Sequence, residues 1–481
     1  MTSSEEQRRA LWAAIARAAT AHVVMLRDAA IVDDTIAGSV LSAIDAVSRA
    51  DPPSAPGSLS LVAAFDERVD SLSSPAAAGG VRLARARFDL AATAQRLVLR
   101  DHALVLLGSL HTARAALLDL AEDNVFTLLQ AWSGASQLQP TNVAHFLSDI
   151  IAPLGRTGRR LDAALSDLDM TPLGAAALTG PGLPIDRDET ADLLGATRPV
   201  ASTFDALTAV DHVSALAQIA AESVLPIRRL FSELLVWLRT DPQALRLGDE
   251  LLAPADNTLP QYRPPVVLER VIARSRDVEN AADGAVRLIR ETPYGPATEL
   301  TDLAFASTVA ALSEAAAVTD AFAVLVSGPI ELNRAWLARN AGRAFVTAGD
   351  LADFLILEEG VSPAAAREIA ALTASRAADD GLEASGINPG IIDGAALLVL
   401  GRELGVEIER LGAFLAPRRY IEKRTLLGGP SPVAVREYLA GERTQLESDR
   451  RQIEAVRRRH ALAAENLTIR SHEISATAST G

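Results

Sequence analysis

The chain of 481 residues has no cysteine, a single lysine and few aromatic residues. Without cysteine it can form no disulfide, no zinc–thiolate centre and no thiol nucleophile. Lys423 is the only lysine, so any role that needs an ammonium group falls to this residue or goes unfilled. Aromatic residues make up 4% of the chain and hydrophobic residues 49%, many of them alanine. This balance favours long, closely packed helices over β-sandwiches, which need aromatic and β-branched strands.

Charge and length narrow the class of protein further. The formal net charge is −15, whereas a nucleic-acid-binding protein needs a positive surface for the phosphates. No uncharged apolar run is long enough to cross a bilayer, and the N-terminus carries acidic residues without the apolar core of a signal peptide. We therefore expect a cytoplasmic protein with a large core that contacts neither nucleic acid nor membrane.

Apolar residues recur at helical spacing along most of the chain, and glycine- and proline-rich breaks separate these stretches. The longest helical patterns cover Asp205–Arg239, Val266–Arg290 and Glu299–Asn340. No stretch shows a convincing strand pattern. The sequence therefore predicts an all-α protein whose middle helices are long enough to run the length of a bundle.

Two finer expectations concern helix ends. Pro140 stands where a proline in the first turn would begin a helix over Thr141–Asp167. Near the C-terminus, a charged helix is expected over Glu442–Asn466. The remaining Leu467–Gly481 is expected to be a disordered tail, because chain ends are poorly ordered unless something holds them.

The stretch Ala253–Glu269, APADNTLPQYRPPVVLE, interrupts the helical pattern between two long helices. Its four prolines exclude a continuous helix, because proline lacks an N–H and restricts the residue before it. Long loops in compact helical proteins often carry function, and a plain connection between helices is the alternative. The polar residues between the prolines are Asp256, Asn257, Gln261, Tyr262 and Arg263.

The chain lacks the common phosphate-, dinucleotide- and zinc-binding motifs and the nucleophile elbow of serine hydrolases. Its seven histidines show no metal-ligand pairing on one helix face, so we expect neither a metal nor an organic cofactor. His145 is the histidine best placed for chemistry, with a packing role as the alternative. Arg85 and Arg87 are candidates for carboxylate or phosphate binding, with a solvated helix face as the alternative.

Five segments resemble motifs of argininosuccinate lyase. Thr171–Gly195 (TPLGAAALTGPGLPIDRDETADLLG) resembles the family's PLGxxALAGTxxPIDRxxTAxxLGF, and Thr347–Leu355 (TAGDLADFL) resembles TATDLADYL. Gln139–His145 (QPTNVAH) resembles QPVTFAH, Ala21–Leu26 (AHVVML) resembles AHVKML, and Arg418–Pro432 resembles the family's closing segment. Because the segments are collinear with those motifs, the chain is identified as an argininosuccinate lyase-like member of the fumarase/aspartase superfamily.

The resemblance implies a fold, an assembly and a reaction. The subunit would be all-α with three domains, at residues 1–84, at residues 85–342 with the long central helices and the signature loop 253–265, and at residues 343–481. The central helices would pack into one bundle at the heart of a homotetramer, with active sites where three subunits meet. The family reaction is a cofactor-independent β-elimination, in which a base removes a proton α to a carboxylate and fumarate is released.

The chain departs from the family at the signature loop. The family's GSSxMPxKxNP lies over Ala255–Pro265, so its serine pair, lysine and asparagine fall on Asp256, Asn257, Tyr262 and Pro264. In the family the serine is the expected base, and the lysine and asparagine are the expected partners of the substrate carboxylates. No shifted register restores the lysine, because the chain's single lysine lies elsewhere.

Two further motifs have lost polar groups. The family's Thr-His-Leu-Gln falls on Ser133–Ser136, which puts Gly134 at the histidine and a serine at the glutamine. The family's GRSRNDQ falls on Ala84–Leu90, ARARFDL, which keeps both arginines but puts Phe88 at the substrate-binding asparagine. Both changes predict a roomier and more apolar pocket.

A last motif is lost at the start of the long helical pattern Glu299–Asn340. The family's YNxDxQEDK falls on Pro296–Ala304 without its tyrosine, glutamine and lysine, and only a two-residue shift lets Tyr294 stand in. The scaffold motifs survive while the catalytic ones do not. Random drift would change scaffold and catalytic motifs alike. We therefore infer that the fold and the assembly are kept and that the lyase chemistry is abandoned.

Two hypotheses follow. In the first, the superfamily cleft is relined and acts on a carboxylated, non-succinyl small molecule by elimination, Michael-type addition or cyclisation. In the second, the chain is a catalytically inactive relative with a structural or regulatory role. For the first hypothesis the acid–base candidates are Asp256, Tyr262, Ser133, His145 and Tyr294. The substrate-binding candidates are Arg85, Arg87, Phe88, Ser136, Gln139, Asn257 and Arg263.

We predict no detectable cleavage of argininosuccinate, adenylosuccinate, malate or aspartate. The missing base and carboxylate partners are groups that each contribute about 10²–10⁴-fold to such reactions. Fumarate release by the purified protein, followed by ultraviolet absorbance beside an active argininosuccinate lyase, should stay at background. Release at ordinary lyase rates would overturn this interpretation.

Overall fold

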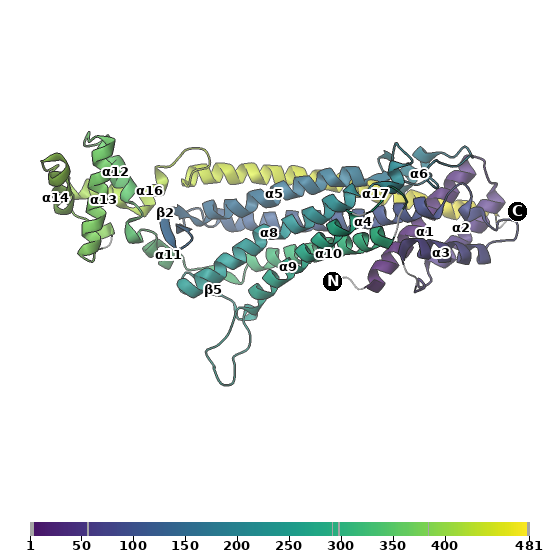
Figure 1. Cartoon of the computed structure of the whole chain (residues 1–481), viewed down its shortest axis with the longest axis horizontal. Coiled ribbons are helices and arrows are strands. Elements are labelled where there is room, and N and C mark those ends of the chain that lie inside the picture. The colour runs from purple at the N-terminus through teal and green to yellow at the C-terminus, as the bar shows by residue number, and fades with distance from the viewer. Residues whose placement is uncertain (1–3, 55–56, 291, 297–298, 383, 479–481) are drawn as a thin grey trace.

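The computed structural model describes residues 4–54, 57–290, 292–296, 299–382 and 384–478. Most of these residues are helical, so the predicted all-α class is confirmed. The molecule is elongated, and its long helices lie side by side along the long axis (Figure 1). These helices are α4 (Arg87–Glu122), α5 (Val143–Leu168), α8 (Asp211–Thr240), α9 (Val266–Ile289), α10 (Glu299–Val326) and α17 (Pro432–Ala478).

Shorter elements gather at the two ends of this bundle (Figure 1). At the end that holds the N-terminal helices lie α1 (Ser4–Asp28), α2 (Asp34–Ser48), α3 (Gly57–Leu72), η1 (Gly80–Arg82), β3 (Met170–Thr171), α6 (Arg187–Leu194), β4 (Arg198–Pro199) and α7 (Asp205–Thr208). At the opposite end lie β1 (Leu128–Ser133), β2 (Ser136–Asn142), β5 (Leu245–Leu247), η2 (Asp249–Leu251), β6 (Ile330–Leu332), α11 (Arg334–Asn340) and η3 (Arg343–Phe345).

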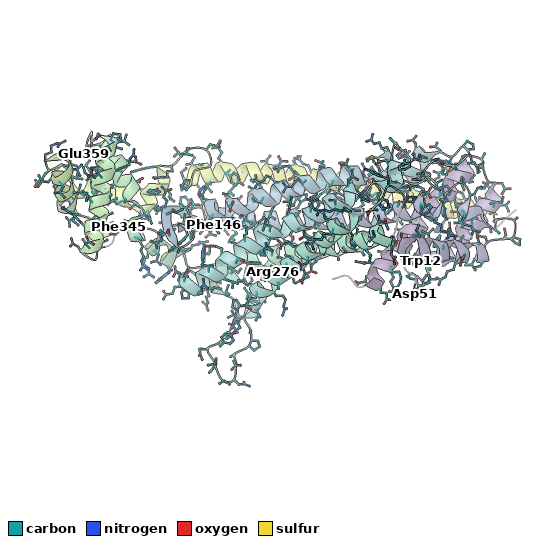
Figure 2. The ribbon with its side chains drawn as sticks, in the orientation of Figure 1. Trp12, Asp51, Phe146, Arg276, Phe345 and Glu359 are labelled. Atoms are coloured by element: carbon teal, nitrogen blue, oxygen red, sulfur yellow. The ribbon has the colours of Figure 1, made fainter. Side chains whose placement is uncertain are left out.

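A group of short helices continues the chain beyond that second end (Figure 1). It comprises α12 (Ala348–Leu357), α13 (Pro363–Asp379), η4 (Ala384–Gly386), α14 (Pro389–Leu400), α15 (Ile408–Leu415) and α16 (Pro417–Glu422). Its apolar side chains form a hydrophobic cluster of their own, around Phe354 and Ile392. Phe345 lies at the boundary with the bundle and Glu359 on the far side of the group (Figure 2).

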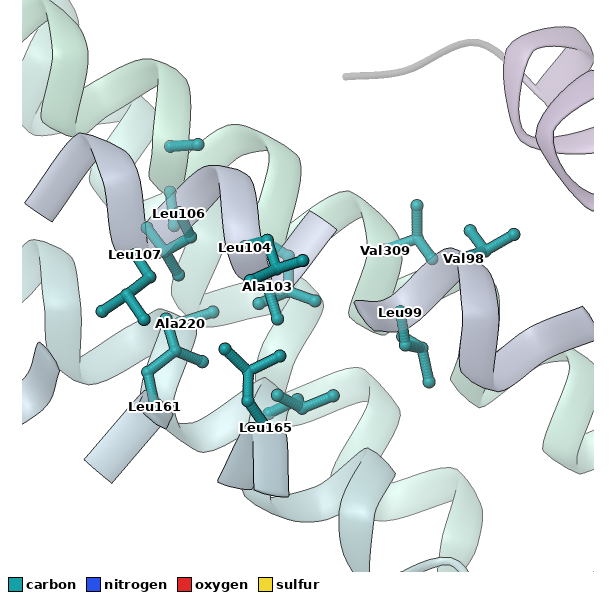
Figure 3. Packing of buried hydrophobic residues seen from close by; sticks show 14 of the residues in the cluster. Val98, Leu99, Ala103, Leu104, Leu106, Leu107, Leu161, Leu165, Ala220 and Val309 are labelled. Carbon is teal, nitrogen blue, oxygen red and sulfur yellow. The ribbon is translucent and has the colours of Figure 1, made fainter. Parts of the chain in front are cut away.

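The core of the bundle is built mainly from leucine, valine and alanine. Leu99 and Leu106 of α4, Leu161 of α5 and Val309 of α10 are fully buried and lie within one continuous cluster (Figure 3). Each buried leucine contributes about 1.5–3 kcal/mol relative to an exposed one. Small residues such as Ala220 of α8 let the helices approach closely.

The expectation that the chain has no strands was wrong. Strands β1 and β2 form an antiparallel hairpin in which Leu128 pairs with Asn142 and Ser133 with Ser136. Strands β5 and β6 form a second antiparallel pair, and β3 and β4 a short parallel one. Buried and exposed residues do not alternate along β1 and β2, and the other strands have only two or three residues, so the sequence shows no alternating pattern.

Pro140 was also misplaced by the sequence pattern. It lies in β2, opposite Gln130, and α5 begins three residues later at Val143. The helix start is set instead by Asn142, whose side chain accepts a hydrogen bond from the backbone N–H of His145 at 2.8 Å. An N-terminal cap decided this boundary, not a proline in the first turn.

The predicted disordered tail is also wrong over its described part, because α17 continues to Ala478. Residues 479–481 lie outside the described residues. From Leu439 onward, the buried residues of α17 recur every seven positions, so they form one narrow seam along one side of the helix. They are Leu439, Leu446, Ile453, His460, Leu467 and Ile474. The last two continue the seam, and this is why the helix does not stop at Asn466.

Two helices, α4 and α10, are long and apolar enough to cross a membrane by length and composition alone. In the structure 61% and 67% of their apolar windows are buried inside the protein. Packing within the bundle therefore accounts for their composition, as it does for the core helices of globular proteins.

We predict that the chain assembles as a homotetramer through α8, α9 and α10. Leu225 of α8 and Leu303 and Val324 of α10 remain 42%, 51% and 69% exposed in the single chain, and apolar surface of this kind is covered by symmetric association. Light scattering at micromolar concentration should give the tetramer mass. Val324→Glu should shift the mass downward, while Leu462→Glu, on the exposed face of α17, should not. A stable monomer for the unaltered chain would contradict the prediction.

Candidate functional site

The candidate residues lie at opposite ends of the bundle. Arg85, Arg87 and Phe88 stand at the start of α4, and Ser133 lies on the hairpin that follows its end. Helix α4 has 36 residues, which at a rise of 1.5 Å each is about 54 Å. One copy of the chain therefore cannot bring the two groups to a common substrate.

At the N-terminal end, Arg85 forms a buried ion pair with Asp66. Its Nη2 donates to Asp66 at 2.5 Å, and the two side chains are only 1% and 2% exposed. Burial raises the pKa of Asp66, although the Arg85 guanidinium opposes this. His22 is fully buried beside this pair, and its Nε2 donates to the carbonyl oxygen of Leu83 at 2.7 Å.

Asp89 organises the glycine-rich segment next to it. Its carboxylate accepts backbone N–H groups from Ala86 at 3.0 Å, Gly174 at 3.1 Å and Ala176 at 2.9 Å. Burial raises the pKa of Asp89 to about 6. Gly174 has a φ of +83°, and a Cβ there would lie 2.7 Å from the side chain of Ile185, so both backbone conformation and space require glycine.

The remaining candidates at this end are more accessible. Arg87 is exposed, and Phe88 is half-buried against a small cluster that contains Val200 and Leu207. Tyr294 is 91% exposed in the connection between α9 and α10. Of the neighbouring motif at Pro296–Ala304, residues 297 and 298 lie outside the described residues.

At the opposite end, His145 joins the hairpin to the segment before α17. The Nδ1 of its ring hydrogen-bonds with the hydroxyl of Thr141 at 2.8 Å, and its Nε2 donates to the carbonyl oxygen of Gly428 at 3.1 Å. The side-chain amide of Asn142 donates to the carbonyl oxygen of Pro430 at 2.6 Å. Ser133, Ser136 and Gln139 are exposed on the hairpin itself.

Tyr420 of α16 is a candidate that sequence reasoning missed. Its side chain is 1% exposed, and the side chain of Gln139 lies next to its hydroxyl. Arg424 lies over its ring, 3.3 Å from the centroid, and also donates to Asp350 at 2.7 Å. Burial raises the pKa of Tyr420, which keeps the phenol protonated. The only signal in the sequence was its place in the closing motif Arg418–Pro432.

The loop that carries the other candidates projects from the side of the bundle (Figures 1 and 2). Asp256 accepts the backbone N–H groups of Thr258 at 2.7 Å and Leu259 at 3.0 Å, so its carboxylate shapes the loop. Arg263 donates to Asp249 at 2.8 Å at the base of the loop. Tyr262 is 57% exposed, and Asn257 is exposed beside Asp256.

The arrangement offers acid–base groups but no pre-formed metal site. Among the described residues, no three histidine, aspartate or glutamate side chains are placed to hold a metal ion together. The hairpin end combines a buried phenol, an imidazole and exposed hydroxyl and amide groups. The N-terminal end combines an exposed guanidinium with an aromatic ring. The first group can exchange protons, and the second can hold a carboxylate.

A protein-family model described as a lyase matches residues 14–279. The chain belongs to this lyase family. It is 29% identical over 432 residues to argininosuccinate lyase 2 of Agrobacterium fabrum, which covers 89% of this chain and 85% of that protein. It is 28% identical to argininosuccinate lyase of Methanoculleus marisnigri, over 95% of this chain and 92% of that one.

Solved structures agree with this placement. EDDS lyase in complex with formate has a TM-score of 0.87 and 25% identity, and the match covers 98% of this lyase and 93% of that chain. Class II fumarase from Schistosoma mansoni, at a TM-score of 0.69 and 13% identity, shares the fold. The chain is thus an argininosuccinate lyase-like member of the fumarase/aspartase superfamily, as its motifs indicated.

We predict that His22 makes the folded chain less stable in acid. Burial lowers the pKa of His22 from 6.5 to about 4. As the pH falls below 6.5, His22 therefore becomes protonated in the unfolded chain but stays neutral in the folded one, which favours unfolding. The loss of stability grows from pH 6.5 down to pH 4 and reaches about 3 kcal/mol at most.

The check is a denaturant-unfolding series at pH 7.5 and pH 4.5. His22→Gln keeps a donor for the carbonyl of Leu83, so the stability difference between wild type and variant should shrink at the lower pH. His472→Gln, at an exposed histidine of α17, is the control and should leave the pH dependence unchanged. An equal difference for His22→Gln at both pH values would contradict the prediction.

Proposed function

We propose that this lyase-family chain is an enzyme whose cleft has been relined for a carboxylated, non-succinyl small molecule. The reaction would be an elimination, a Michael-type addition or a cyclisation. The observation that carries the proposal is the signature loop, in which Asp256, Asn257 and Tyr262 stand at the family's serine pair and lysine while the loop itself is kept. A loop without function would have no reason to remain long and polar.

The exchange of lysine for Tyr262 predicts what the pocket prefers. A lysine is a compact point charge, whereas a phenol offers only a neutral hydrogen bond or an acid. Arg263 does not replace that charge in the single chain, because it pairs with Asp249. The pocket should therefore favour a neutral or singly anionic ligand over a dicarboxylate.

Assembly would complete the site. The N-terminal candidates Arg87 and Phe88 and the hairpin candidates Ser133 and His145 are separated by the length of α4, so different copies in the proposed homotetramer would supply them. In such a site the Tyr262 phenol and the loop carboxylate of Asp256 would serve as acid and base. The arginines would bind the carboxylate of the substrate. The three-domain division at residues 84 and 342 and a cytoplasmic location belong to the same proposal.

The inactive-relative hypothesis is the second candidate. The observation that favours it is that several retained polar residues make contacts within the chain. Arg85 is paired with Asp66, and both ring nitrogens of His145 are engaged by Thr141 and Gly428. In this reading the retained residues maintain a scaffold that binds a partner subunit or regulates an active lyase.

The test compares fumarate with its monoamide, fumaramate, as acceptors for a panel of primary amines. Addition joins the amine nitrogen to one alkene carbon and a proton to the other, and the loss of alkene absorbance measures it. We expect faster turnover with the singly anionic fumaramate. Turnover with fumarate alone would refute the proposed preference. No turnover and no binding of either acceptor would favour the inactive-relative hypothesis.

We predict that Tyr262→Phe and Asp256→Asn lower kcat at least 100-fold, since acid–base groups contribute about 10²–10⁴-fold. Asp256→Asn keeps an oxygen that can accept the N–H groups of Thr258 and Leu259, so the loop should stay folded. Asp256→Ala also removes the turn and is the matched comparison. Thermal unfolding should be unchanged in all three variants, because loop substitutions outside the core cost little stability. Unchanged kcat in Tyr262→Phe and Asp256→Asn would remove the loop from the mechanism.

A further inference from the structure

A cluster of buried arginines lies at the N-terminal end of the bundle, where α4, α6 and α17 meet the segment around Asp169. Arg100 of α4 is 2% exposed, and Arg96, one turn earlier, is 7% exposed. Arg459 of α17 pairs with Asp169, and His460 also contacts that carboxylate at 3.0 Å. None of these residues belongs to the candidate site described above.

Arg100 is only partly satisfied. Its Nη1 donates to Asp169 at 3.3 Å and to the carbonyl oxygen of Leu194 at 3.2 Å. Its Nε and Nη2 are buried and have no hydrogen-bond partner in the described part of the chain. Arg17 shares the Leu194 carbonyl at 3.4 Å, and its own buried Nε is also unpartnered. Unpaired buried guanidinium donors are costly and imply a missing partner.

The space for a partner is present. A partly open cavity of about 10 Å³ is lined by Arg100 and Arg96 together with Asp169, Thr93 and Ala196. By the usual measure this holds one water-sized guest. A water could accept one or two hydrogen bonds but would leave the charge unbalanced.

The charges favour an anion over water. The buried guanidinium groups that line the cavity are Arg96 and Arg100, while the half-buried Arg17 and the 42% exposed Arg459 lie outside its lining. The one carboxylate that lines the cavity is Asp169. The other carboxylates near these arginines are exposed to solvent: Asp101, 3.9 Å from Arg100, and Asp167, Asp205 and Asp211 near Arg96. Like charges are poorly screened away from water. We propose that this cavity binds a single monatomic anion, chloride in the cell, between α4 and the segment around Asp169.

The proposal predicts chloride-dependent stability, because a ligand that binds only the folded state raises the unfolding temperature. Thermal unfolding of the full chain is measured as sodium chloride replaces sodium gluconate at constant ionic strength. We expect a rise of about 2 °C on this exchange. An equal unfolding temperature in the two salts would refute chloride binding.

Two variants assign the effect to this cavity. Ala196→Val fills the space while leaving the arginines in place, so it should fold and lose the chloride response. Arg9→Gln, at an exposed arginine paired with Glu5, should retain the full response. A chloride response that persists in Ala196→Val would place the anion elsewhere and overturn the assignment.

A crystal grown in sodium bromide gives an independent readout that needs no variant. Bromide replaces chloride and scatters anomalously, so the expected result is an anomalous peak within hydrogen-bond distance of Arg100. An ordered water at that position without anomalous signal would show that the cavity is merely hydrated, and the proposal would then be wrong.

Discussion

The packing of α17 along α4 is the constraint on which the rest of the molecule depends. Its seam of one buried residue every seven positions is too narrow to hold a charged helix by apolar contact alone. Buried ion pairs complete the attachment. Arg114 of α4, fully buried, donates to Glu442 and Asp449 at 3.1 and 2.7 Å. Removing one partner from such a pair costs about 3–5 kcal/mol, because the other charge is left buried.

The same contact explains a glycine in a neighbouring helix. A Cβ at Gly155 of α5 would lie 3.1–3.2 Å from the guanidinium of Arg114. A side chain there would have to push the guanidinium aside by a few tenths of an ångström, and glycine avoids this crowding. Near the middle of α17, the carboxylate of Asp169 receives Arg459 and His460. Helix α17 is thus held by ion pairs at two places along its length, and its buried seam sets its register.

These attachments separate the residues that maintain the fold from those that perform chemistry. Asp89 holds the glycine-rich segment by three backbone N–H groups, and Arg187 binds the carbonyl oxygens of Leu173 and Val200. Both lie in motifs that resemble the lyase family, and both act within the scaffold. A chain can lose the family's loop serine and lysine without disturbing any of these contacts. This is how a lyase fold can persist while its active-site chemistry changes.

The sequence by itself determined the fold class and the family. Helical periodicity and alanine content predicted the long helices, because a buried face must recur along the helix wherever it packs. Collinear motifs identified the superfamily. The seven-residue apolar repeat of α17 was also present in the sequence, but it was not recognised. One buried residue in seven gives only a weak apolar pattern when most of its neighbours are polar or charged.

Only the tertiary structure decided which polar residues are free to act. Arg85 and Arg87 stand two positions apart in one motif, yet one is buried against Asp66 and the other faces solvent. The sequence pattern did not single out Tyr420, and its buried hydroxyl next to Gln139 follows from packing with a segment far away in the chain. The hairpin likewise arises from pairing between strands along which buried and exposed residues do not alternate. Burial, pairing and charge compensation are properties of neighbours in space, and the order of residues does not specify them locally.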